Sequence, residues 1–429
     1  MMYKTGILCL LLGGLVPFAE ALPLWIRPDA KSGAFQVEQV QVRLSHFNTK
    51  WIGVEQKGGA VTGKATNSPE AFSFKGNWKV GNDSFTLEES IRRISGDTVE
   101  YRAKVFSDRP VDTSSIRLNF VLPLEIVKDR SVRIGKERLR YSKEVSKKVH
   151  PFSRVEVVEI ELPEGTLEIH GEPFSAVFQD NRVYLPKNSK SPGTYTVHVH
   201  PQKSVRKKDQ PTSAEFRYTF SFKGLKSVPL DLSKVANRGF RDDVAGDGKG
   251  GWNDQGPRND LRMFRPGDYR FFGVEFHVLD PAKTGEKSCV VLNGEKQTCF
   301  LDSATIGSAG KKGKYLYLLH ANAYSGSKEK SGSISVKFAD GSKQEILVRD
   351  RVDVGNWWGA INWKNAHIVW KGSNDSSVLG LYMTGFELKR NDPVEITFGK
   401  GDYSVWMIVA ASLTDRKATP YLTDSTVYI

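Results

Sequence analysis

The sequence contains little cysteine and methionine, with 3 Cys and 5 Met among 429 residues. Its 8 histidines form no metal-binding motif, and no Cys/His spacing typical of a zinc site is present. A Gly-x-Ser-x-Gly nucleophile motif, a phosphate loop and a dinucleotide-binding fingerprint are also missing. The sequence therefore argues against a zinc site, a nucleophile-elbow hydrolase and a nucleotide-binding enzyme.

Long apolar runs are equally scarce, and the only candidate lies at the start of the chain. Lys4 precedes an apolar stretch at 7–18, and an Ala-Glu-Ala triplet ending at Ala21 fits a signal-peptidase site. The stretch is shorter than the ~20 residues needed to span a bilayer. Residues 1–21 are therefore predicted to be a cleaved signal peptide, and the mature protein to be periplasmic, at the cell surface or secreted, without membrane insertion.

Two cysteines remain after the signal peptide, Cys289 and Cys299. They flank a segment with Asn293-Gly294 at its centre, and this dipeptide favours a β-hairpin turn. In such a hairpin the two cysteines face each other, and an oxidising compartment favours a disulfide between them. The alternative is a pair of free thiols at a sheet edge.

The net charge is +13, and lysine and arginine are concentrated at 128–148 and 203–208. A basic surface can bind nucleic acid, but the expected export argues against that partner. An anionic polysaccharide or another acidic surface is the partner that we expect. The alternative is a solvated basic face with no ligand.

The strand signals predict an all-β protein with two β-sandwich domains, because short alternating runs are separated by Gly and Pro turns. We expect a signal peptide at 1–21, an N-terminal β-sandwich at 22–225, a second domain at 226–415 and a C-terminal tail at 416–429. The expected strands of the first domain lie at 35–44 (with one bulge), 98–105, 115–122, 155–162, 166–169, 195–200 and 215–222.

About eight strands are expected in the second domain, which suits an antiparallel jelly roll. A turn at Ala339-Asp340-Gly341-Ser342 is expected to join two of them. The strands are expected at 274–278, 288–292, 315–319, 333–338, 344–348, 378–384, 394–398 and 405–410.

An acidic, glycine-rich segment at 239–256 opens the second domain. Its composition excludes a helix or a strand, so it must be a loop. Calcium prefers six to eight hard oxygen ligands, which such a loop can supply, although the EF-hand spacing is absent. The alternatives are an irregular loop held by Asx turns and direct sugar binding. The predicted ligands of a structural Ca²⁺ are Asp242, Asp243, Asp247 and Asp254.

Tryptophans in this half are candidates for stacking on the apolar faces of sugars. Trp252 is the best of them, because its glycine-rich surroundings do not favour a core strand. Trp357 and Trp358 are adjacent, so their rings are expected on opposite faces. The alternative is that these rings fill the sandwich core. The predicted carbohydrate-binding residues are Trp252, Trp357 and Trp358, with Arg258, Asn259 and Arg262 as a polar rim.

Six short segments of the second half follow one another in the order typical of a known family, at 228–232, 242–260, 272–276, 315–321, 338–341 and 356–358. On these segments, residues 228–413 resemble the galactose-binding-like jelly-roll modules attached to secreted bacterial glycoside hydrolases. The resemblance implies carbohydrate binding by the second domain. The N-terminal half resembles the β-sandwich that precedes the catalytic barrel of such enzymes, but the chain has no room for a barrel of ~250 residues.

Catalytic signals are weak, and no catalytic residue is assigned. Glu159 and Glu161 share a strand face, which is more typical of a solvated face than of a catalytic pair. His198 and His200 also share a face, as a metal pair or as surface residues. We therefore expect an exported, non-catalytic protein that binds a polysaccharide or glycoconjugate through its second domain. The alternatives are a polysaccharide hydrolase or lyase acting between the domains, and a structural or adhesive envelope protein.

Overall fold

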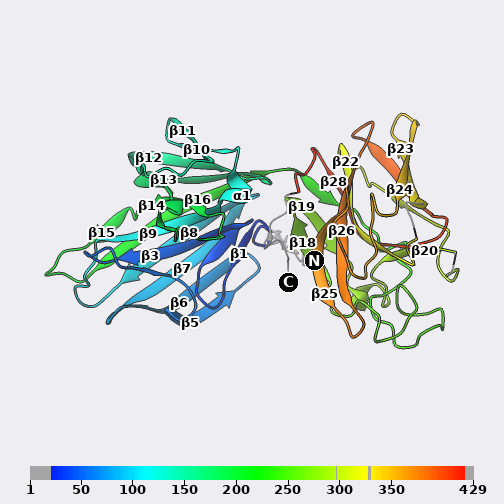
Figure 1. The fold of residues 1–429 in the computed structure, drawn as a ribbon, viewed down its shortest axis with the longest axis horizontal. Helices are drawn as coiled ribbons and strands as arrows, with labels where there is room; N and C mark the ends of the chain where they lie inside the picture. Colours follow the sequence, from blue (N-terminus) through cyan, green and yellow to red (C-terminus); the bar gives the residue numbers. More distant parts are fainter. Residues whose placement is uncertain (1–20, 296, 327–329, 421–429) are drawn as a thin grey trace, which may run out of the picture.

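The computed structural model describes residues 21–295, 297–326 and 330–420. The predicted signal peptide therefore lies outside the described residues, apart from Ala21, as does the end of the predicted tail beyond residue 420. The fold is all-β and of the sandwich type, and Figure 1 shows that it forms two lobes. Within the described ranges, no helix is long and apolar enough to cross a membrane.

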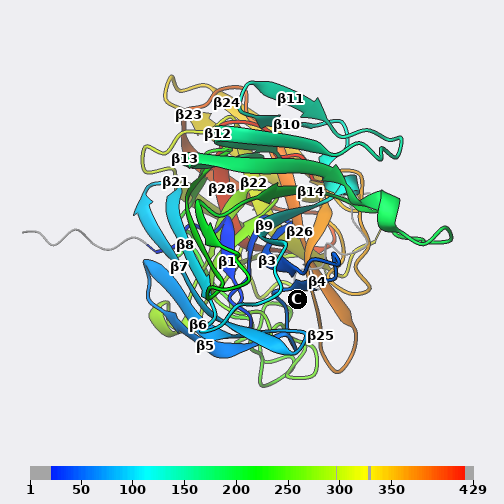
Figure 2. The ribbon, with the colours of Figure 1, turned by 90° about the vertical axis from the view of Figure 1, so that its left-hand side faces the viewer.

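The described residues of the first lobe form sixteen strands, one α-helical turn and one 3-10 turn, η1 (Asn181–Tyr184). The elements are β1 (Ile26–Pro28), β2 (Phe35–Val37), β3 (Val40–Phe47), β4 (Gly53–Glu55), β5 (Val61–Asn67), β6 (Ala71–Val80), β7 (Asp83–Ser95), β8 (Thr98–Phe106), β9 (Ser115–Pro123), α1 (Leu124–Val127), β10 (Ser131–Ile134), β11 (Glu137–Arg140), β12 (His150–Glu161), β13 (Gly165–Asp180), β14 (Thr194–Val199), β15 (Lys203–Val205) and β16 (Ser213–Gly224). They form one antiparallel sheet in the order β1-β2-β3-β9-β14-β13-β16-β8-β7-β6-β5, with the others attached to this path. In Figure 2, β13, β14, β9 and β3 lie together at the end of this lobe.

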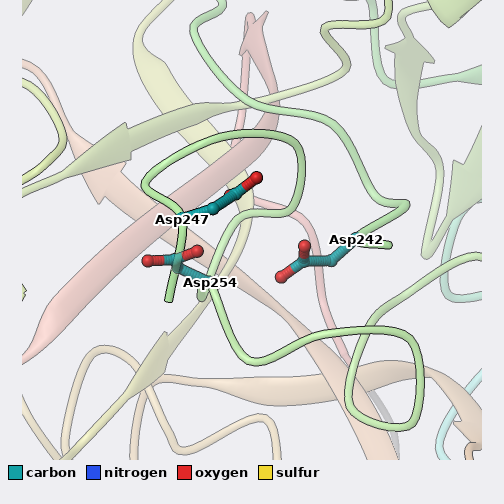
Figure 3. Close-up of side chains that lie close together, drawn as sticks. All are labelled: Asp242, Asp247 and Asp254. Atoms are coloured by element: carbon teal, nitrogen blue, oxygen red, sulfur yellow. The ribbon is translucent and has the colours of Figure 1, made fainter. Parts of the chain in front are cut away.

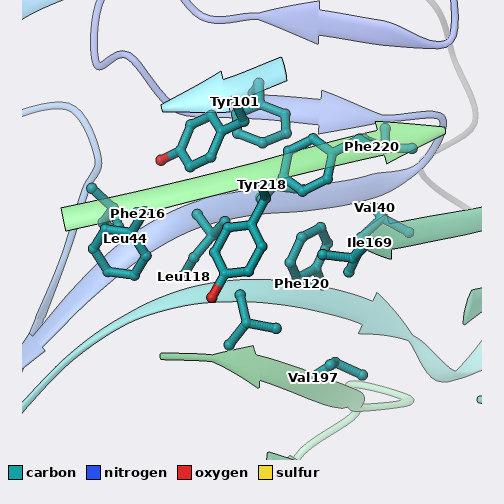
Figure 4. Close-up of a cluster of buried hydrophobic side chains, with 14 of the residues drawn as sticks. Val40, Leu44, Tyr101, Leu118, Phe120, Ile169, Val197, Phe216, Tyr218 and Phe220 are labelled. Carbon is teal, nitrogen blue, oxygen red and sulfur yellow. The ribbon is translucent and has the colours of Figure 1, made fainter. Parts of the chain in front are cut away.

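Alternation along these strands builds the first core. In β16 the side chains of Phe216, Tyr218 and Phe220 are buried on one face, because a strand directs every second residue to the same side. They meet Leu118 of β9 and Tyr101 of β8 in the cluster of Figure 4. The core residues of this lobe all lie between Trp25 and Phe222.

The expected single strand at 35–44 is two strands. Val37 pairs with Val40, so β2 and β3 form a tight hairpin. Glu38 lies in its turn with a φ of 50°. The predicted bulge is therefore wrong: the irregularity in the alternation marks a reversal of the chain.

Apart from residues 296 and 327–329, which the structure does not describe, the second lobe contains twelve strands and one 3-10 turn, η2 (Pro281–Lys283). They are β17 (Ser227–Pro229), β18 (Gly267–Phe271), β19 (Val274–Val278), β20 (Val290–Leu292), β21 (Ser303–Gly307), β22 (Tyr315–Ala323), β23 (Lys330–Phe338), β24 (Lys343–Arg349), β25 (His367–Ser373), β26 (Val378–Glu387), β27 (Pro393–Lys400) and β28 (Val405–Thr414). A six-stranded sheet has the order β17-β28-β22-β26-β25 with β20 beside β28, and a four-stranded sheet has the order β21-β27-β23-β24. The expected turn joins β23 to β24, with Gly341 at a φ of 84°.

Three layers pack in this lobe. One core lies between the six- and four-stranded sheets and includes Leu316, Trp406 and Phe398. The opposite face of the six-stranded sheet is covered by a second core that includes Tyr317 and Trp252. Because β28 is covered on both faces, all ten of its residues are buried. The long segment between β17 and β18, which carries the acidic loop, supplies much of this outer cover.

A buried ion pair joins the two lobes. Arg270 of β18 donates from Nε to the Glu38 carboxylate at 2.6 Å and from Nη1 to Glu275 at 2.9 Å. The Arg270 and Glu38 side chains are only 5% and 1% exposed. Removing one partner of a buried pair leaves the other charge uncompensated, so this contact restrains the relative position of the lobes.

Candidate functional site

The acidic loop is an ordered turn structure on the outer layer of the second lobe. Gly239 donates its backbone N–H to Gly250, and Gly246 donates to the carbonyl of Asp254. Gly246 and Gly248 have φ values of 75° and 69°, a region that glycine adopts without strain. The predicted loop is therefore present, and its glycines permit the sharp turns that direct its carboxylates inward.

Three of the four predicted metal ligands converge. One oxygen each from Asp242, Asp247 and Asp254 lies within 4.8 Å of the others. Figure 3 shows the three side chains close together in the loop. Asp242 and Asp254 are buried, whereas Asp247 is exposed. Burial raises the pKa of Asp242, and the charges of Asp254 and Asp247 add to the rise. A cation would remove the repulsion among these carboxylates, so the donor set fits a hard ion such as Ca²⁺.

Asp243 does not belong to this group, which corrects the predicted ligand set. Its carboxylate accepts from Arg241 Nε at 3.0 Å and lies 3.4 Å from Arg262 Nη2. Asp243 follows Asp242 directly, and its side chain is directed into this exposed ion pair. The salt bridge with two arginines provides its counter-charge without a metal.

Asp260 is a loop carboxylate that was not among the predicted ligands. It is fully buried, accepts from the backbone N–H of Asp242 at 2.9 Å and forms a charge-assisted pair with Arg262. Arg262 also donates to the carbonyl oxygen of Asp242. Arg262 was predicted to contact sugar, but in the structure it holds the loop that carries Asp242.

The two other predicted rim residues have local roles. Asn259 donates its side-chain amide to Gln255, and Arg258 accepts a hydrogen bond at its carbonyl oxygen from Ser376. The Arg258 residue is exposed. The Asn259 contact lies within the loop, and the Ser376 contact joins the loop to the 374–377 turn.

The prediction that Trp252 is an exposed stacking surface is wrong. Its side chain is fully buried, and its ring contacts that of Trp357 edge-to-face at a centroid distance of 5.0 Å. Trp357 is itself only 2% exposed. Both rings fill the core beneath the acidic loop, because this irregular segment covers a sheet face that would otherwise be exposed to water.

Trp358 is the exposed ring of the three, at 41% exposure. Its backbone N–H donates to the side-chain oxygen of Asn356, and the Asn356 Nδ2 donates to Ser325 Oγ. Gly355, which precedes Asn356, packs so closely against Tyr382 that a Cβ added to Gly355 would lie 2.5 Å from the Tyr382 ring. The segment before Trp358 is therefore tightly anchored.

A shallow pocket of about 330 Å³ adjoins the Trp358 ring. The Tyr382 hydroxyl donates to the carbonyl oxygen of Asn356 at 2.9 Å, and the half-exposed Arg351 guanidinium supplies hydrogen-bond donors. The residues that line it are Ser325, Arg351, Asn356, Trp358, Gly359, Ile361, Trp363 and Tyr382. The pocket thus combines an apolar ring with several polar groups. Apart from Trp358, its residues were not predicted as binding residues. Six of the eight lie at 351–363, and Ser325 and Tyr382 come from other segments.

The predicted Cys289–Cys299 disulfide is wrong, since both cysteines are free thiols. Cys289 is buried and burial raises its pKa, whereas Cys299 is exposed. β20 pairs with β28, and its contact with the segment after the turn is an isolated parallel bridge between Leu292 and Leu301. Asn293 binds Leu301 through its backbone N–H and Phe300 through its side chain, so the connection is an irregular loop and not a hairpin.

The paired acids of β12 are engaged with arginines. Glu159 pairs with Arg133, and the hydrogen bond from Arg133 lowers the pKa of the Glu159 carboxyl. Glu161 lies 3.3 Å from Arg138. These contacts also provide counter-charges for part of the basic segment 128–148, as expected of a solvated strand face.

No protein-family model matches the chain, and no curated protein matches it either. Among solved structures, GK1651 from Geobacillus kaustophilus is similar at 13% sequence identity, over 84% of this chain and 96% of that chain, with a TM-score of 0.13. A TM-score this low carries no argument about fold or function. The chemistry of the site must therefore be inferred from its own geometry.

Proposed function

We propose that this protein is an exported, non-catalytic carbohydrate-binding protein. Its second domain, residues 226–415, would be a galactose-binding-like jelly roll that binds polysaccharide at the Trp358 pocket. The observation that carries the proposal is the exposed Trp358 ring beside the polar groups of Asn356 and Arg351. The export part rests on the signal-like sequence of residues 1–21.

The pocket has the chemistry that a sugar requires. A pyranose presents an apolar C–H face, which packs on an aromatic ring, and hydroxyl groups around its edge. Trp358 offers the ring, while Arg351 supplies donors and Ser325 a hydroxyl. Because Asn356 and Gly355 fix the segment, little conformational entropy is lost when a ligand binds. A small open pocket of this kind suits one or two sugar rings of a longer chain.

We also propose that Ca²⁺ binds at Asp242, Asp247 and Asp254 in a structural role. The acidic loop covers Trp252, which packs on Trp357, and Trp357 directly precedes the exposed Trp358. An ion that stabilises the loop would therefore also stabilise the support of the stacking ring. This arrangement predicts that Ca²⁺ strengthens glycan binding without contacting the sugar.

A glycan array followed by calorimetry on the mature chain tests the proposal. Trp358→Ala should abolish binding to at least one glycan found, because it removes the stacking surface of the second lobe. Leu347→Ala, which truncates another exposed apolar side chain of the same lobe, is the matched control and should bind as wild type does. Equal binding by wild type and Trp358→Ala, or no glycan binding at all in the presence of Ca²⁺, would exclude this site.

A further inference from the structure

A second and larger concavity lies on the first lobe, on the sheet face opposite to its core. It has a volume of about 1180 Å³ and extends over β3, β9, β14 and β13, which are neighbours in the sheet. The strand register places Arg43 beside Asn119, and Asn119 beside His198, so these side chains form one row across three strands. Trp51, 62% exposed, lies at its rim. Figure 2 shows these strands side by side.

Arg117 is a buried cation in this pocket. The residue is 9% exposed, its Nε donates to Ser115 at 3.0 Å, and its guanidinium packs over Phe47 at 4.4 Å and Trp51 at 5.5 Å. Among the residues that the structure describes, no carboxylate pairs with it. The two aromatic contacts contribute about 0.5–2 kcal/mol each. A charge removed from water without a partner costs several kcal/mol, so Arg117 lacks full compensation.

The surrounding groups add to this positive potential. The pKa of His198 is lowered to about 3 and that of His200 to about 4, by burial first and then by the charge of Arg117. Arg206 also raises the potential at His200. Glu55 is the acid that lines the pocket, and it already pairs with Arg43 at 3.1 Å. An anionic group would find donors here and would not meet a free carboxylate.

His198 provides an independent indication of a ligand. Its Nδ1 lies 2.7 Å from Asn119 Oδ1, so Nδ1 carries the proton and Nε2 is an acceptor. Nε2 is buried and has no hydrogen-bond partner among the described residues, and the residue lines the pocket with only 6% exposure. A buried polar atom of this kind is normally satisfied. The missing partner must be a donor, such as a hydroxyl group.

We propose that this pocket binds an acidic saccharide, a sugar that carries a carboxylate or a sulfate. The anionic group would bind Arg117 and Arg206, a sugar hydroxyl would donate to His198 Nε2, and the apolar face of a ring would stack on Trp51. A simple inorganic anion cannot satisfy all three groups, because it offers neither an apolar face for Trp51 nor a separate hydroxyl group for His198 Nε2. The site is on the other lobe from Trp358 and does not depend on the function proposed there.

Calorimetric titration of the mature protein tests the site, with trigalacturonate, a heparin-derived disaccharide, neutral maltotriose and inorganic sulfate as probes. At least one of the two acidic sugars should bind, and its affinity should fall at high salt. Maltotriose and inorganic sulfate should bind with lower affinity than that sugar. The heparin disaccharide carries both carboxylate and sulfate groups. Binding of trigalacturonate would therefore show that a carboxylate suffices, and binding of the heparin disaccharide alone would show that a sulfate is required. Trp358→Ala should leave this binding unchanged, which separates the site from the one on the second lobe.

Two variants and a control locate the binding. Arg117→Gln and Trp51→Ala should each weaken the affinity for the acidic sugar about tenfold or more, equivalent to ~1.4 kcal/mol. Arg92→Gln removes an exposed charge of the same lobe outside the pocket and should have no such effect. If Arg117→Gln does not fold, Trp51→Ala alone tests the site, because the Trp51 ring is exposed and its removal should leave the fold intact. Wild-type affinity in Trp51→Ala, tighter binding of maltotriose, or no binding of either acidic sugar would overturn the proposal.

Discussion

The acidic loop makes the sharpest prediction, which is that Ca²⁺ stabilises the wild-type protein but not Asp254→Asn. Asp254 has a φ of 53°, which asparagine tolerates better than most residues, so the substitution changes charge with little backbone strain. It also keeps one oxygen for the Gly248 N–H. The comparison therefore isolates the contribution of the carboxylate charge.

The expected magnitude follows from the geometry. The oxygens of Asp242 and Asp254 lie within 4.8 Å, where two charges repel by about 1 kcal/mol in water and about 4 kcal/mol at an effective dielectric of 20. Without Ca²⁺, Asp254→Asn removes this repulsion and should be no less stable than wild type. Extracellular calcium modules bind with Kd values of about 10⁻⁴–10⁻³ M. At ~10 mM Ca²⁺ the wild type should therefore gain about 1.4–2.7 kcal/mol.

Thermal unfolding followed by circular dichroism, in chelator and in ~10 mM CaCl₂, measures this gain. For a lobe of this size the wild-type Tm should rise by about 3–10 °C, and most of the rise should be lost in Asp254→Asn. Asp243→Asn is the control, because Asp243 follows Asp242 but pairs with arginines, and it should respond to Ca²⁺ as wild type does. A wild-type Tm that ignores Ca²⁺, or equal shifts in wild type and Asp254→Asn, would refute the reasoning.

Three further predictions concern stability and thiol reactivity. Trp252→Ala should lower the free energy of unfolding by about 3–5 kcal/mol in a urea titration, whereas Trp358→Ala should change it by under ~0.5 kcal/mol, because only Trp252 is fully buried. Burial raises the pKa of Glu89 from 4.5 to about 8, so the folded state retains a proton that the unfolded chain loses. The stability that this proton contributes is fully present below pH ~4.5 and is lost as the pH rises through ~8, and the total loss is at most roughly 5 kcal/mol. Urea titrations across this pH range should therefore show the free energy of unfolding falling with pH in wild type, and falling less steeply in Glu89→Gln. A thiol reagent should modify Cys299 in the folded protein and Cys289 only after unfolding, and a reductant should leave the Tm unchanged; a single unreactive disulfide would contradict the structure.

The fold class could be predicted from the sequence because alternation is a local signal. The expected strands at 115–122, 215–222 and 405–410 correspond to β9, β16 and β28. The strands β5, β6 and β7 were not predicted, although β6 alternates Phe72 and Phe74 with polar residues and was recognisable. The disulfide prediction was wrong because a turn dipeptide predicts a local reversal, whereas the pairing of β20 with β28 depends on a residue contact across more than a hundred positions.

The acidic loop shows what local composition can and cannot predict. Its glycines and acids predicted an irregular loop with converging carboxylates, and three of the four named carboxylates do converge. The same composition suggested that Trp252 is exposed, which was wrong. Backbone irregularity says nothing about what the loop covers, and here it covers the outer face of the six-stranded sheet. A tryptophan in such a loop is buried because the sheet face beneath it is apolar.

The pocket of the first lobe could not have been predicted from one strand. In sequence, Ser115, Arg117 and Asn119 are alternate residues of β9, the pattern of an ordinary solvent-facing strand surface. Their burial arises because β14 brings His198 beside Asn119 and because the turn after β3 places Trp51 over Arg117. Alternation determines which face a side chain joins, but only the sheet order determines its neighbours. A sheet that binds a sugar on its outer face therefore has the same local sequence pattern as one that faces only water.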